Sequence, residues 1–563
     1  MKKIKQIKGL LIGAIAMTSV TFFQSCEIDI PLQDRYTEEA IWSDPTTAEL
    51  YVNGLYAEFK KFQFGLFPNL GYDNATDALS DIMKYTSTTA GNGTVNILVS
   101  GANQFSAGSV GLNYWDSGYE RIRRVNEFLY GVKNKSVLSD EQKLKYEAEA
   151  RFVRGYAYFW LVRIHGSVIL FDNIEQYESK DNPRSSEDDC WNFIAADFAF
   201  AAEHLDKTNL PGRATKGAAY GMLARAWIYA ASIAENDRKQ FNSDPLTGIP
   251  QEKALAYYTN AMNAANEVVA LANEGLYALD PNFASIFTNK NTKEAIFRVD
   301  FSAPQITHQY DLGFAPPGDA PGNALVYGVP TAELVDEFEM ADGTQFSWSN
   351  PAHSANPYAD REPRFYATVL YHGAEWKGRT LNLMESSSEG FIQYGSMGDP
   401  KRTVSGYYAK KMLDPQNTNF VVNKSTQSWI ELRYAEVLLI LAEAQAGTNQ
   451  LDDAVGTINQ LRGERGLPDV YANTKQDVMA LVEHERKVEL AFEGHRFWDL
   501  RRWRKAHIVL NDVRFTGHKY NGTEYEVVSV DNVDRGFTGA LYYLPIPEAE
   551  DQRNDALDQI KGW

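Results

Sequence analysis

The sequence predicts a mainly α-helical protein in which successive helices pack in pairs and one long, loop-rich insertion interrupts them. Apolar residues recur every three or four positions in several segments, as they do along the buried face of an α-helix. Residues 283–423 depart from this pattern, because prolines there separate short strand-like pieces such as Ala295–Val299. The chain is 44% hydrophobic and 23% charged, which is typical of a globular protein.

The first 25 residues form a targeting segment. Four lysines lie within the first eight residues, and the apolar run Leu10–Val20 that follows is short for a membrane span. Ser25 directly before Cys26 resembles the end of a bacterial lipobox, which predicts cleavage before Cys26 and acylation of its thiol. The acidic residues Glu27 and Asp29 then favour display on the cell surface. Ordinary secretion with a free Cys26 is the alternative.

Charge and cysteine usage limit the classes of function. The formal net charge is −19, which argues against a nucleic-acid partner because phosphates would be repelled. Cys190 is the one cysteine left once Cys26 is lipidated, so no disulfide framework is available. Its place beside Trp191 favours a small buried residue over a nucleophile. Aromatic residues make up 13% of the chain, enough to supply rings to a surface as well as to the core.

The periodicity places helices in chain order. Asp44-Pro45 opens a helix that runs to about Phe62, because proline is favoured in the first turn. Residues 65–110 lack a helical period and are rich in Gly, Asn, Ser and Thr, which is typical of a functional or mobile loop. Later helices are predicted at about residues 115–129, 141–164, 190–205, 216–234, 251–273, 430–446 and 452–465.

Small residues recur among large apolar ones in three of these segments, namely Arg154–Leu161, Ala218–Arg225 and Arg433–Leu439. Small side chains let two helices approach closely while rings fill the gaps beside them. The recurrence predicts tetratricopeptide-like helix pairs in two helical units, residues 115–275 and 430–506. A helical core without repeats is the alternative.

The rest of the chain is expected to pack around the stretch Asp477–Ala506. Its first half is an amphipathic helix that Gly494 can end, with Glu483 and Lys487 spaced to pair on its outer side. Its second half holds three aromatic residues and four arginines within residues 496–504. Buried rings, and arginines with carboxylate or carbonyl partners, would make this a rigid clamp between distant segments. A basic groove for nucleic acid is the alternative, which the acidic chain disfavours.

Several motifs, taken in this order, resemble the SusD/RagB family of outer-membrane lipoproteins. Beside Cys26, the resemblance rests on Tyr358–Phe365, Ile430–Leu439 with Ala442–Ala444, Ile458–Arg462, Gly494–Trp503 and Leu544–Pro547. It spans nearly the whole chain. Two departures are Glu362, where the family usually has Asp, and the ending Asp558–Trp563.

The resemblance implies a SusD-like fold, with a signal peptide at residues 1–25 and a single domain at residues 26–563. It implies a lipoprotein anchored in the outer membrane through Cys26, exposed on the cell surface, that delivers oligosaccharides to a SusC-like TonB-dependent transporter. Such proteins bind without catalysis, and neither a cofactor nor a metal is expected. The helical units would face the transporter, and the loop-rich portions, residues 65–110 and 283–423, would build the glycan site.

Aromatic residues in irregular, polar surroundings are the candidate glycan contacts. A sugar offers apolar faces to an aromatic ring and a rim of hydroxyl groups to polar side chains. The candidates are Asp77, Tyr85, Tyr310, Trp348 and Trp376. Each ring could instead serve packing, and Asp77 could cap a helix.

Two other classes of function stay open. A helical-repeat surface lipoprotein could bind peptide or protein instead of glycan. A glycoside hydrolase would need two paired carboxylates, which could hide among 74 acidic residues. Zinc protease chemistry is disfavoured, because Val488 stands where the second zinc-binding histidine after His484-Glu485 belongs. The acidic turn Asp531–Asp534 lacks a complete calcium-binding loop.

Overall fold

The computed structural model describes residues 38–57, 59, 76–88, 112, 114–236, 243–398, 400–418 and 424–563. The predicted signal peptide, Cys26 and most of the predicted loop at residues 65–110 lie outside the described residues. Within the described residues, no helix is long and apolar enough to cross a membrane.

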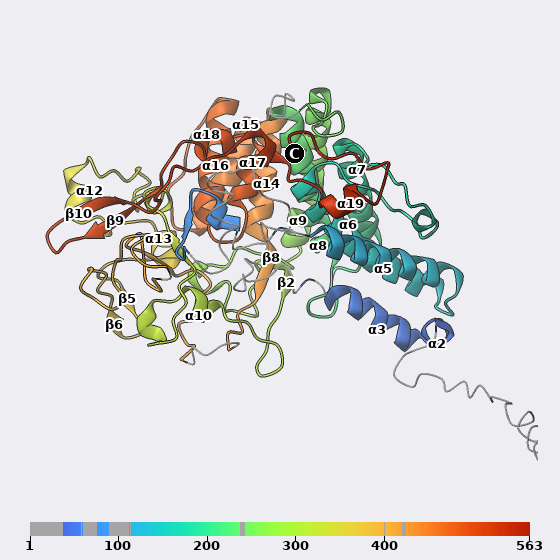
Figure 1. The fold of residues 1–563 in the computed structure, drawn as a ribbon, viewed down its shortest axis with the longest axis horizontal. Coiled ribbons are helices and arrows are strands. Elements are labelled where there is room, and N and C mark those ends of the chain that lie inside the picture. Colours follow the sequence, from blue (N-terminus) through green and yellow to red (C-terminus); the bar gives the residue numbers. More distant parts are fainter. Residues whose placement is uncertain are drawn as a thin grey trace, which may run out of the picture.

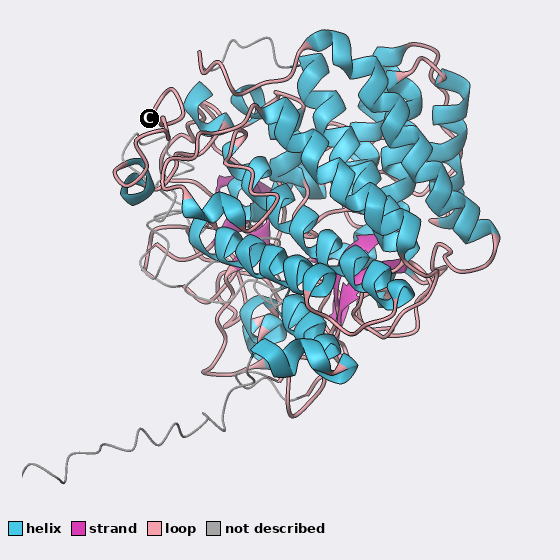
Figure 2. Ribbon diagram, turned by 90° about the vertical axis from the view of Figure 1, so that its right-hand side faces the viewer, coloured by secondary structure: helices cyan, strands magenta, loops and turns pink. Residues whose placement is uncertain are grey.

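A row of long helices forms one side of the molecule (Figures 1 and 2). Each helix from α5 to α9 packs against the next one along the chain. The row comprises α2 (Glu38–Ser43), α3 (Pro45–Tyr56), α5 (Trp115–Asn134), α6 (Asp140–His165), α7 (Glu187–His204), α8 (Lys216–Asn236) and α9 (Ala254–Asn273). The predicted helices of the first unit are therefore confirmed in order, although α3 ends earlier than predicted.

The second helical unit continues this row, although the insertion separates the two units in sequence. α14 (Tyr434–Gly447) packs against α8 and α9 and also against α15 (Leu451–Glu464) and α16 (Lys475–Glu489). The chain then adds α17 (Arg496–Arg502), α18 (Ala506–Val509) and α19 (Glu548–Asp551). The predicted mainly α fold, with consecutive helix pairs and an irregular insertion, is confirmed.

Small residues set the spacing between helices and their neighbours, as the sequence predicts. A Cβ atom on Gly221 of α8 would lie 2.3 Å from Leu432 Cδ2. A Cβ atom on Gly447 of α14 would lie 2.4 Å from the ring of Tyr258 on α9. Protein interiors are close-packed, so a side chain at either glycine would force these elements apart.

Two predicted boundaries are wrong, the first because a strand distant in sequence pairs with the segment and the second because of the turn that follows the helix. Ile430 does not begin a helix. Residues Trp429–Arg433 instead form β8, which pairs antiparallel with the correctly predicted strand β2 (Ala295–Val299). α16 ends at Glu489, before Gly494 is reached, because Phe492 and Gly494 both have positive φ angles, of 66° and 78°, in the turn that follows.

Short strands and helices make up the loop-rich part, which lies on the left of Figure 1, away from α5 and α7. The strands pair as β1 with β3, β4 with β7, β5 with β6, and β9 with β10. Their bounds are β1 Met83–Tyr85, β3 Gly328–Pro330, β4 Val369–Leu370, β5 Glu375–Trp376, β6 Arg379–Thr380, β7 Tyr408–Ala409, β9 Thr516–Tyr520 and β10 Tyr525–Ser529. The short helices here are α10 (Tyr310–Phe314), α11 (Ala332–Val335), α12 (Pro351–Ala355) and α13 (Pro363–Thr368).

The described part of the predicted loop at residues 65–110 passes through the interior. Residues 76–86 are buried and contain a 3-10 turn followed by β1. Asp81 in this segment lies 2.8 Å from Arg496 Nε and 3.2 Å from Lys487 Nζ. Lys487 is thus buried and does not pair with Glu483 on an outer face, as the sequence spacing predicted.

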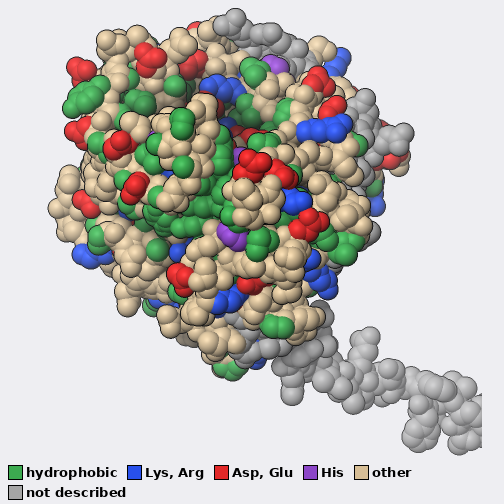
Figure 3. Space-filling view, turned by 90° about the vertical axis from the view of Figure 1, so that its left-hand side faces the viewer, with side chains coloured by type: hydrophobic (Ala, Val, Ile, Leu, Met, Phe, Trp, Pro, Cys, Tyr) green, Lys and Arg blue, Asp and Glu red, His purple; other side chains and the backbone are tan. Residues whose placement is uncertain are grey.

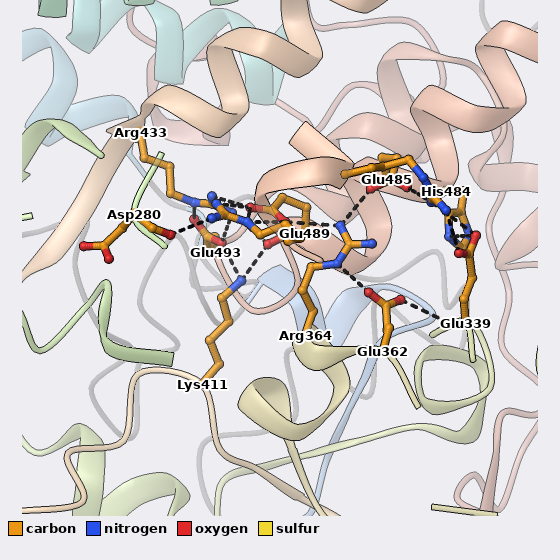
Figure 4. A network of polar contacts seen from close by, with 12 residues as sticks. Asp280, Glu339, Glu362, Arg364, Lys411, Arg433, His484, Glu485, Glu489 and Glu493 are labelled. Carbon is orange, nitrogen blue, oxygen red and sulfur yellow. Dashed lines mark hydrogen bonds and ion pairs between the residues drawn. The ribbon is translucent and has the colours of Figure 1, made fainter. Parts of the chain in front are cut away.

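Helix α16 and the turn after it carry buried carboxylates that meet cationic groups from distant segments (Figure 4). Glu489 accepts hydrogen bonds from Arg433 at 2.7 Å, from Arg465 at 2.8 Å and from Arg364 at 3.2 Å. Burial alone would raise the pKa of Glu489, but the three guanidinium groups hold it well below its usual value. Figure 4 shows the same network extending to Glu362, Lys411, Glu485 and Glu493.

The arginine-rich half of the central stretch is a clamp, as its composition predicts. Arg502 pairs with Glu443 of α14 at 2.7 Å and with Asp499 at 2.8 Å. Arg501 donates to the main-chain carbonyls of Arg163 and Ile164 at 3.0 and 3.2 Å. These guanidinium groups are buried and committed to protein partners, so they offer no groove to a nucleic acid.

The edge of this ion-pair network makes stability depend on pH. His484 of α16 lies 2.9 Å from Glu337 Oε1 and 3.4 Å from Glu339 Oε1. Burial opposes the charge on His484, but hydrogen bonds to the two carboxylates prevail and raise its pKa from 6.5 to about 10. The charged form therefore stabilises the fold fully below pH 6.5, and this contribution is lost as the pH rises through 10.

His484→Gln is expected to melt below the unchanged chain near neutral pH, and this difference is expected to shrink as the pH approaches 10. Thermal unfolding of both proteins across that range measures the difference. Because all other titrating groups are common to both, their contributions largely cancel. A difference that stays constant with pH would contradict the assignment of charge to His484.

Candidate functional site

An open cleft of about 820 Å³ is lined by the β9–β10 hairpin, by residues 354–359 at the end of α12 and just after it, and by residues 371–373. This volume lies within the range of ligand-binding clefts. Figure 3 views the molecule from the side on which β9, β10 and α12 lie, and it shows a hollow in which hydrophobic side chains gather. The rings that line the cleft are Trp348, Tyr358, Tyr371, His372, His518, Tyr520 and Tyr525.

The hairpin presents one of its two faces to the cleft. Side chains alternate between the faces of a strand, so His518 and Tyr520 of β9 point the same way, as do Tyr525 and Val527 of β10. The register places Tyr525 opposite Tyr520 and Val527 opposite His518. All four therefore share one face, and all four line the cleft.

Ring contacts join the lining into a continuous aromatic belt. The rings of His372 and Tyr520 have centroids 4.5 Å apart, and those of Tyr520 and Tyr525 are 4.8 Å apart. Tyr358 meets Tyr525 edge to face at 5.4 Å and lies 4.4 Å from Tyr371. Such contacts restrain the rings in position, so the stacking surface is in place before any ligand arrives.

Trp348 is held in the cleft by a partly buried carboxylate. Its indole Nε1 donates to both oxygens of Asp336, at 3.1 and 3.0 Å. Its ring lies 4.4 Å from that of His518 and 5.7 Å from that of Tyr525. Burial raises the pKa of Asp336 from 3.8 to about 7, against the hydrogen bond from Trp348 and the charge of Arg361.

The raised pKa of Asp336 can be tested by measuring how the melting temperature of Asp336→Asn depends on pH. A carboxyl whose pKa rises on folding contributes stability below its unfolded pKa of 3.8, and the contribution is lost as the pH rises through 7. An asparagine does not titrate, so the melting temperature of Asp336→Asn relative to the unchanged chain is expected to increase across this range. A relative melting temperature that is flat, or that falls with pH, would refute the raised pKa.

A chain of buried polar groups fixes the floor of the cleft. Tyr358 donates its hydroxyl to Tyr407 at 3.1 Å, and Tyr407 in turn lies 2.8 Å from His518 Nδ1. Arg361 lies below the floor, where it donates to the carbonyls of Val335 at 2.6 Å and Phe338 at 2.7 Å. The motif Tyr358–Phe365 therefore supplies both a lining ring and its support.

One of the five predicted contacts, Trp348, lines the cleft, and the side chains of the other four are buried away from it. Asp77 accepts the backbone N–H of Gly494 at 3.0 Å, and burial raises its pKa. Tyr85 stacks on Tyr327 with ring planes 4° apart.

The two remaining predicted rings also have interior partners. Tyr310 donates its hydroxyl to the carbonyl of Lys411 at 3.2 Å and stacks on Phe314 at 4.5 Å. Trp376 donates its indole N–H to Asp319 at 2.8 Å and is 5% exposed. Neither ring offers a face to a ligand as it stands.

Most residues that line the cleft were not predicted from the sequence, although the sequence does contain a signal for the β9–β10 hairpin. Residues 517–527 read GHKYNGTEYEV. Aromatic or apolar side chains occupy every second position before and after Asn521-Gly522, and polar or charged ones lie between them. An Asn-Gly pair between alternating segments is a strong hairpin signal. In the structure Gly522 has a φ of 102°, and Asn521 accepts the N–H groups of Thr523 and Glu524 at 2.9 and 3.0 Å.

Residues considered for metal or nucleophilic chemistry have structural roles. Asp531 accepts from Lys84 at 2.7 Å and from Arg535 at 2.9 Å, so it belongs to a buried ion-pair cluster. Cys190 is buried, as predicted, and burial raises the pKa of its thiol. Across the described ranges, no group of three or more His, Cys, Asp or Glu side chains is arranged to hold a metal ion.

Comparison with known proteins gives consistent matches over both helical units and the insertion. A family model described as the SusD family matches residues 285–563, and one described as "Starch-binding associating with outer membrane" matches residues 57–228. A curated relative, SusD-like protein P2 of Formosa agariphila, is 25% identical over 476 residues, which is 79% of each chain.

Two solved structures from Bacteroides fragilis share the fold over almost their whole length. A SusD-like protein superposes with a TM-score of 0.75 at 28% identity, covering 93% of this chain and 98% of its own. A SusD-like carbohydrate-binding protein also has a TM-score of 0.75, at 25% identity, covering 92% of this chain and 100% of its own.

Proposed function

The chain belongs to the SusD/RagB family, and from this we propose that it binds carbohydrate chains in its aromatic cleft. The observation that carries the proposal is the belt of rings around an open cleft of about 820 Å³. Tyrosine and tryptophan faces receive the apolar C–H faces of sugar rings, while hydroxyl and imidazole groups meet the sugar hydroxyls. The carbohydrate-binding description of a relative at 25% identity supports the same class of ligand.

The bound chain is passed on, in this proposal, to a SusC-like TonB-dependent transporter in the outer membrane. The lipobox-like sequence before Cys26 supports an anchor in the outer membrane, and Glu27 and Asp29 support exposure on the cell surface. The row α5–α9 would face the transporter. The β9–β10 hairpin, which lines the cleft, lies on the side of the molecule away from α5 and α7 (Figure 1), so carbohydrate in the cleft would stay accessible from outside.

We propose binding without catalysis. Hydrolysis of a glycosidic bond uses two carboxyl groups that flank it. Among the described lining residues, Glu524 is the one carboxylate, and the nearby Asp336 is occupied by the indole of Trp348. Stacking on an open surface gives affinities on the order of micromolar to millimolar, which suits a protein that must release its cargo.

Affinity electrophoresis against a panel of soluble polysaccharides tests the proposal, with the unchanged chain and Trp348→Ala run side by side. We expect retardation of the unchanged chain by at least one polysaccharide and weaker retardation of the variant. Equal retardation of both would remove the cleft as the site. New reducing ends after incubation would instead support a hydrolase.

A second experiment addresses the partner. Purification of the full, lipidated chain from outer membranes is expected to bring down a TonB-dependent barrel. Recovery of a soluble protein or peptide partner in its place would favour the alternative function, a helical-repeat scaffold on the cell surface.

A further inference from the structure

The described lining of the cleft carries no lysine or arginine, and its one charged side chain is that of Glu524. Glu524 lies in the turn between β9 and β10 and is exposed. Its backbone N–H donates to Asn521 Oδ1 at 3.0 Å, so Glu524 holds the turn through its main chain. Glu524 therefore gives the described lining a single formal charge, which is negative.

The cations nearest in sequence to the lining are committed elsewhere. Lys519 lies between His518 and Tyr520 on β9, so strand alternation turns it to the opposite face, where it pairs with Glu385 at 2.7 Å. Arg361 is 2% exposed below the floor, and its guanidinium group lies over the ring of Phe346 at 4.1 Å. Neither is placed to meet a negative group inside the cleft.

The two histidines of the lining supply no positive charge near neutral pH. Burial, with the charge of Arg361, lowers the pKa of His518 from 6.5 to about 4. Burial also lowers the pKa of His372. Asp336 lies 3.7 Å from His518 Nε2 and adds negative charge beside this histidine as it ionises.

From the charge distribution around the rings we infer that the cleft accepts uncharged carbohydrate chains and rejects anionic ones, with Glu524 as the residue that discriminates. This inference rests on the proposed function. A uronate or sulfate group entering the cleft would lose water and find no cation to replace it, and it would approach a like charge. The hydroxyl groups of a neutral sugar would find tyrosine hydroxyl and imidazole partners instead.

Matched pairs of polymers test the inference. Amylopectin, mixed-linkage β-glucan and hydroxyethyl cellulose serve as neutral probes, and a carboxymethyl derivative of each backbone serves as its anionic counterpart. For any backbone that binds, the carboxymethyl form is expected to bind about tenfold more weakly at low salt. Added salt is expected to reduce this difference in affinity, because it screens repulsion between exposed charges.

Glu524→Lys should reverse this preference, and Glu464→Lys is the matched control. Glu464 is exposed at the end of α15, so its replacement changes the net charge equally without touching the cleft. We expect Glu524→Lys to bind the carboxymethyl polymer at least as tightly as the neutral one and Glu464→Lys to behave as the unchanged chain.

The outcomes separate the two levels of the proposal. Anionic forms that bind the unchanged chain as tightly as neutral ones, or more tightly, would overturn the charge selection and leave carbohydrate binding in place. If the difference in affinity between neutral and carboxymethyl polymers were the same in Glu524→Lys as in Glu464→Lys, the role of Glu524 would be overturned. Failure of every polymer, neutral or anionic, to bind would overturn the proposed function and this inference with it.

Discussion

Replacing Glu489 by glutamine is expected to lower the free energy of unfolding by about 3–5 kcal/mol, because it leaves buried guanidinium groups without their shared carboxylate. Arg433 and Arg465 lie 2.7 and 2.8 Å from Glu489 Oε1, and Arg364 lies 3.2 Å from Oε2. The side chain of Glu489 is fully buried, so water cannot take over its role. A large drop in melting temperature, or loss of soluble protein, would be the result.

Glu127→Gln provides the control for this prediction. Glu127 pairs with Arg123 at 2.9 Å on α5, and its side chain is 46% exposed. An exposed pair of this kind contributes roughly 0.3–0.5 kcal/mol, so its loss should barely move the melting temperature. Similar shifts for Glu127→Gln and Glu489→Gln would show that the buried network does not hold the fold together.

The parts of the fold that the sequence predicted well are those in which local signals agree. The helix predicted at residues 141–164 spans Asp140–His165 in the structure, and a capping box of Ser139 and Gln142 fixes its start. The strand predicted at Ala295–Val299 has those bounds. In this helix and this strand, the residue pattern and the signals that bound the element predict the same structure.

The buried charges could not be read from local sequence. Glu483 and Lys487 have the spacing of an exposed pair, yet the buried Lys487 pairs with Glu337 at 3.0 Å. Its partners, Glu337 and Asp81, both lie more than one hundred residues away in the chain and have no local signature. Where a charged side chain is buried depends on which distant segment covers it, and periodicity says nothing about that.

For a related reason, four of the five predicted contacts lie outside the cleft. The polar neighbours of Trp376, Lys377 and Gly378, favour a ligand contact, but its indole N–H is satisfied by Asp319 and its ring is covered. Polar neighbours show that a ring lies in an irregular segment, without showing which way it faces. Strand alternation does carry that information, and in β9 and β10 it places four side chains on the cleft face.

Tyr520→Ala is expected to weaken carbohydrate binding about tenfold, equivalent to about 1.4 kcal/mol, while changing stability little. Tyr520 is half-buried in the aromatic belt and touches His372 and Tyr525 by ring contacts at 4.5 and 4.8 Å. Among the described residues, no hydrogen bond depends on the Tyr520 side chain, whereas Asp336 accepts one from the indole of Trp348. The substitution therefore removes a stacking face and leaves no buried polar atom unsatisfied.

Tyr471→Ala is the matched control, because Tyr471 is 87% exposed between α15 and α16 and does not line the cleft. Both variants remove one tyrosine ring, so a nonspecific loss of aromatic surface would affect them alike. Retardation by a bound polysaccharide should fall for Tyr520→Ala alone, with melting temperatures of both variants close to that of the unchanged chain. If Tyr471→Ala lost binding equally, the ring belt would not be the surface that carbohydrate contacts, since stacking acts only where a face is presented.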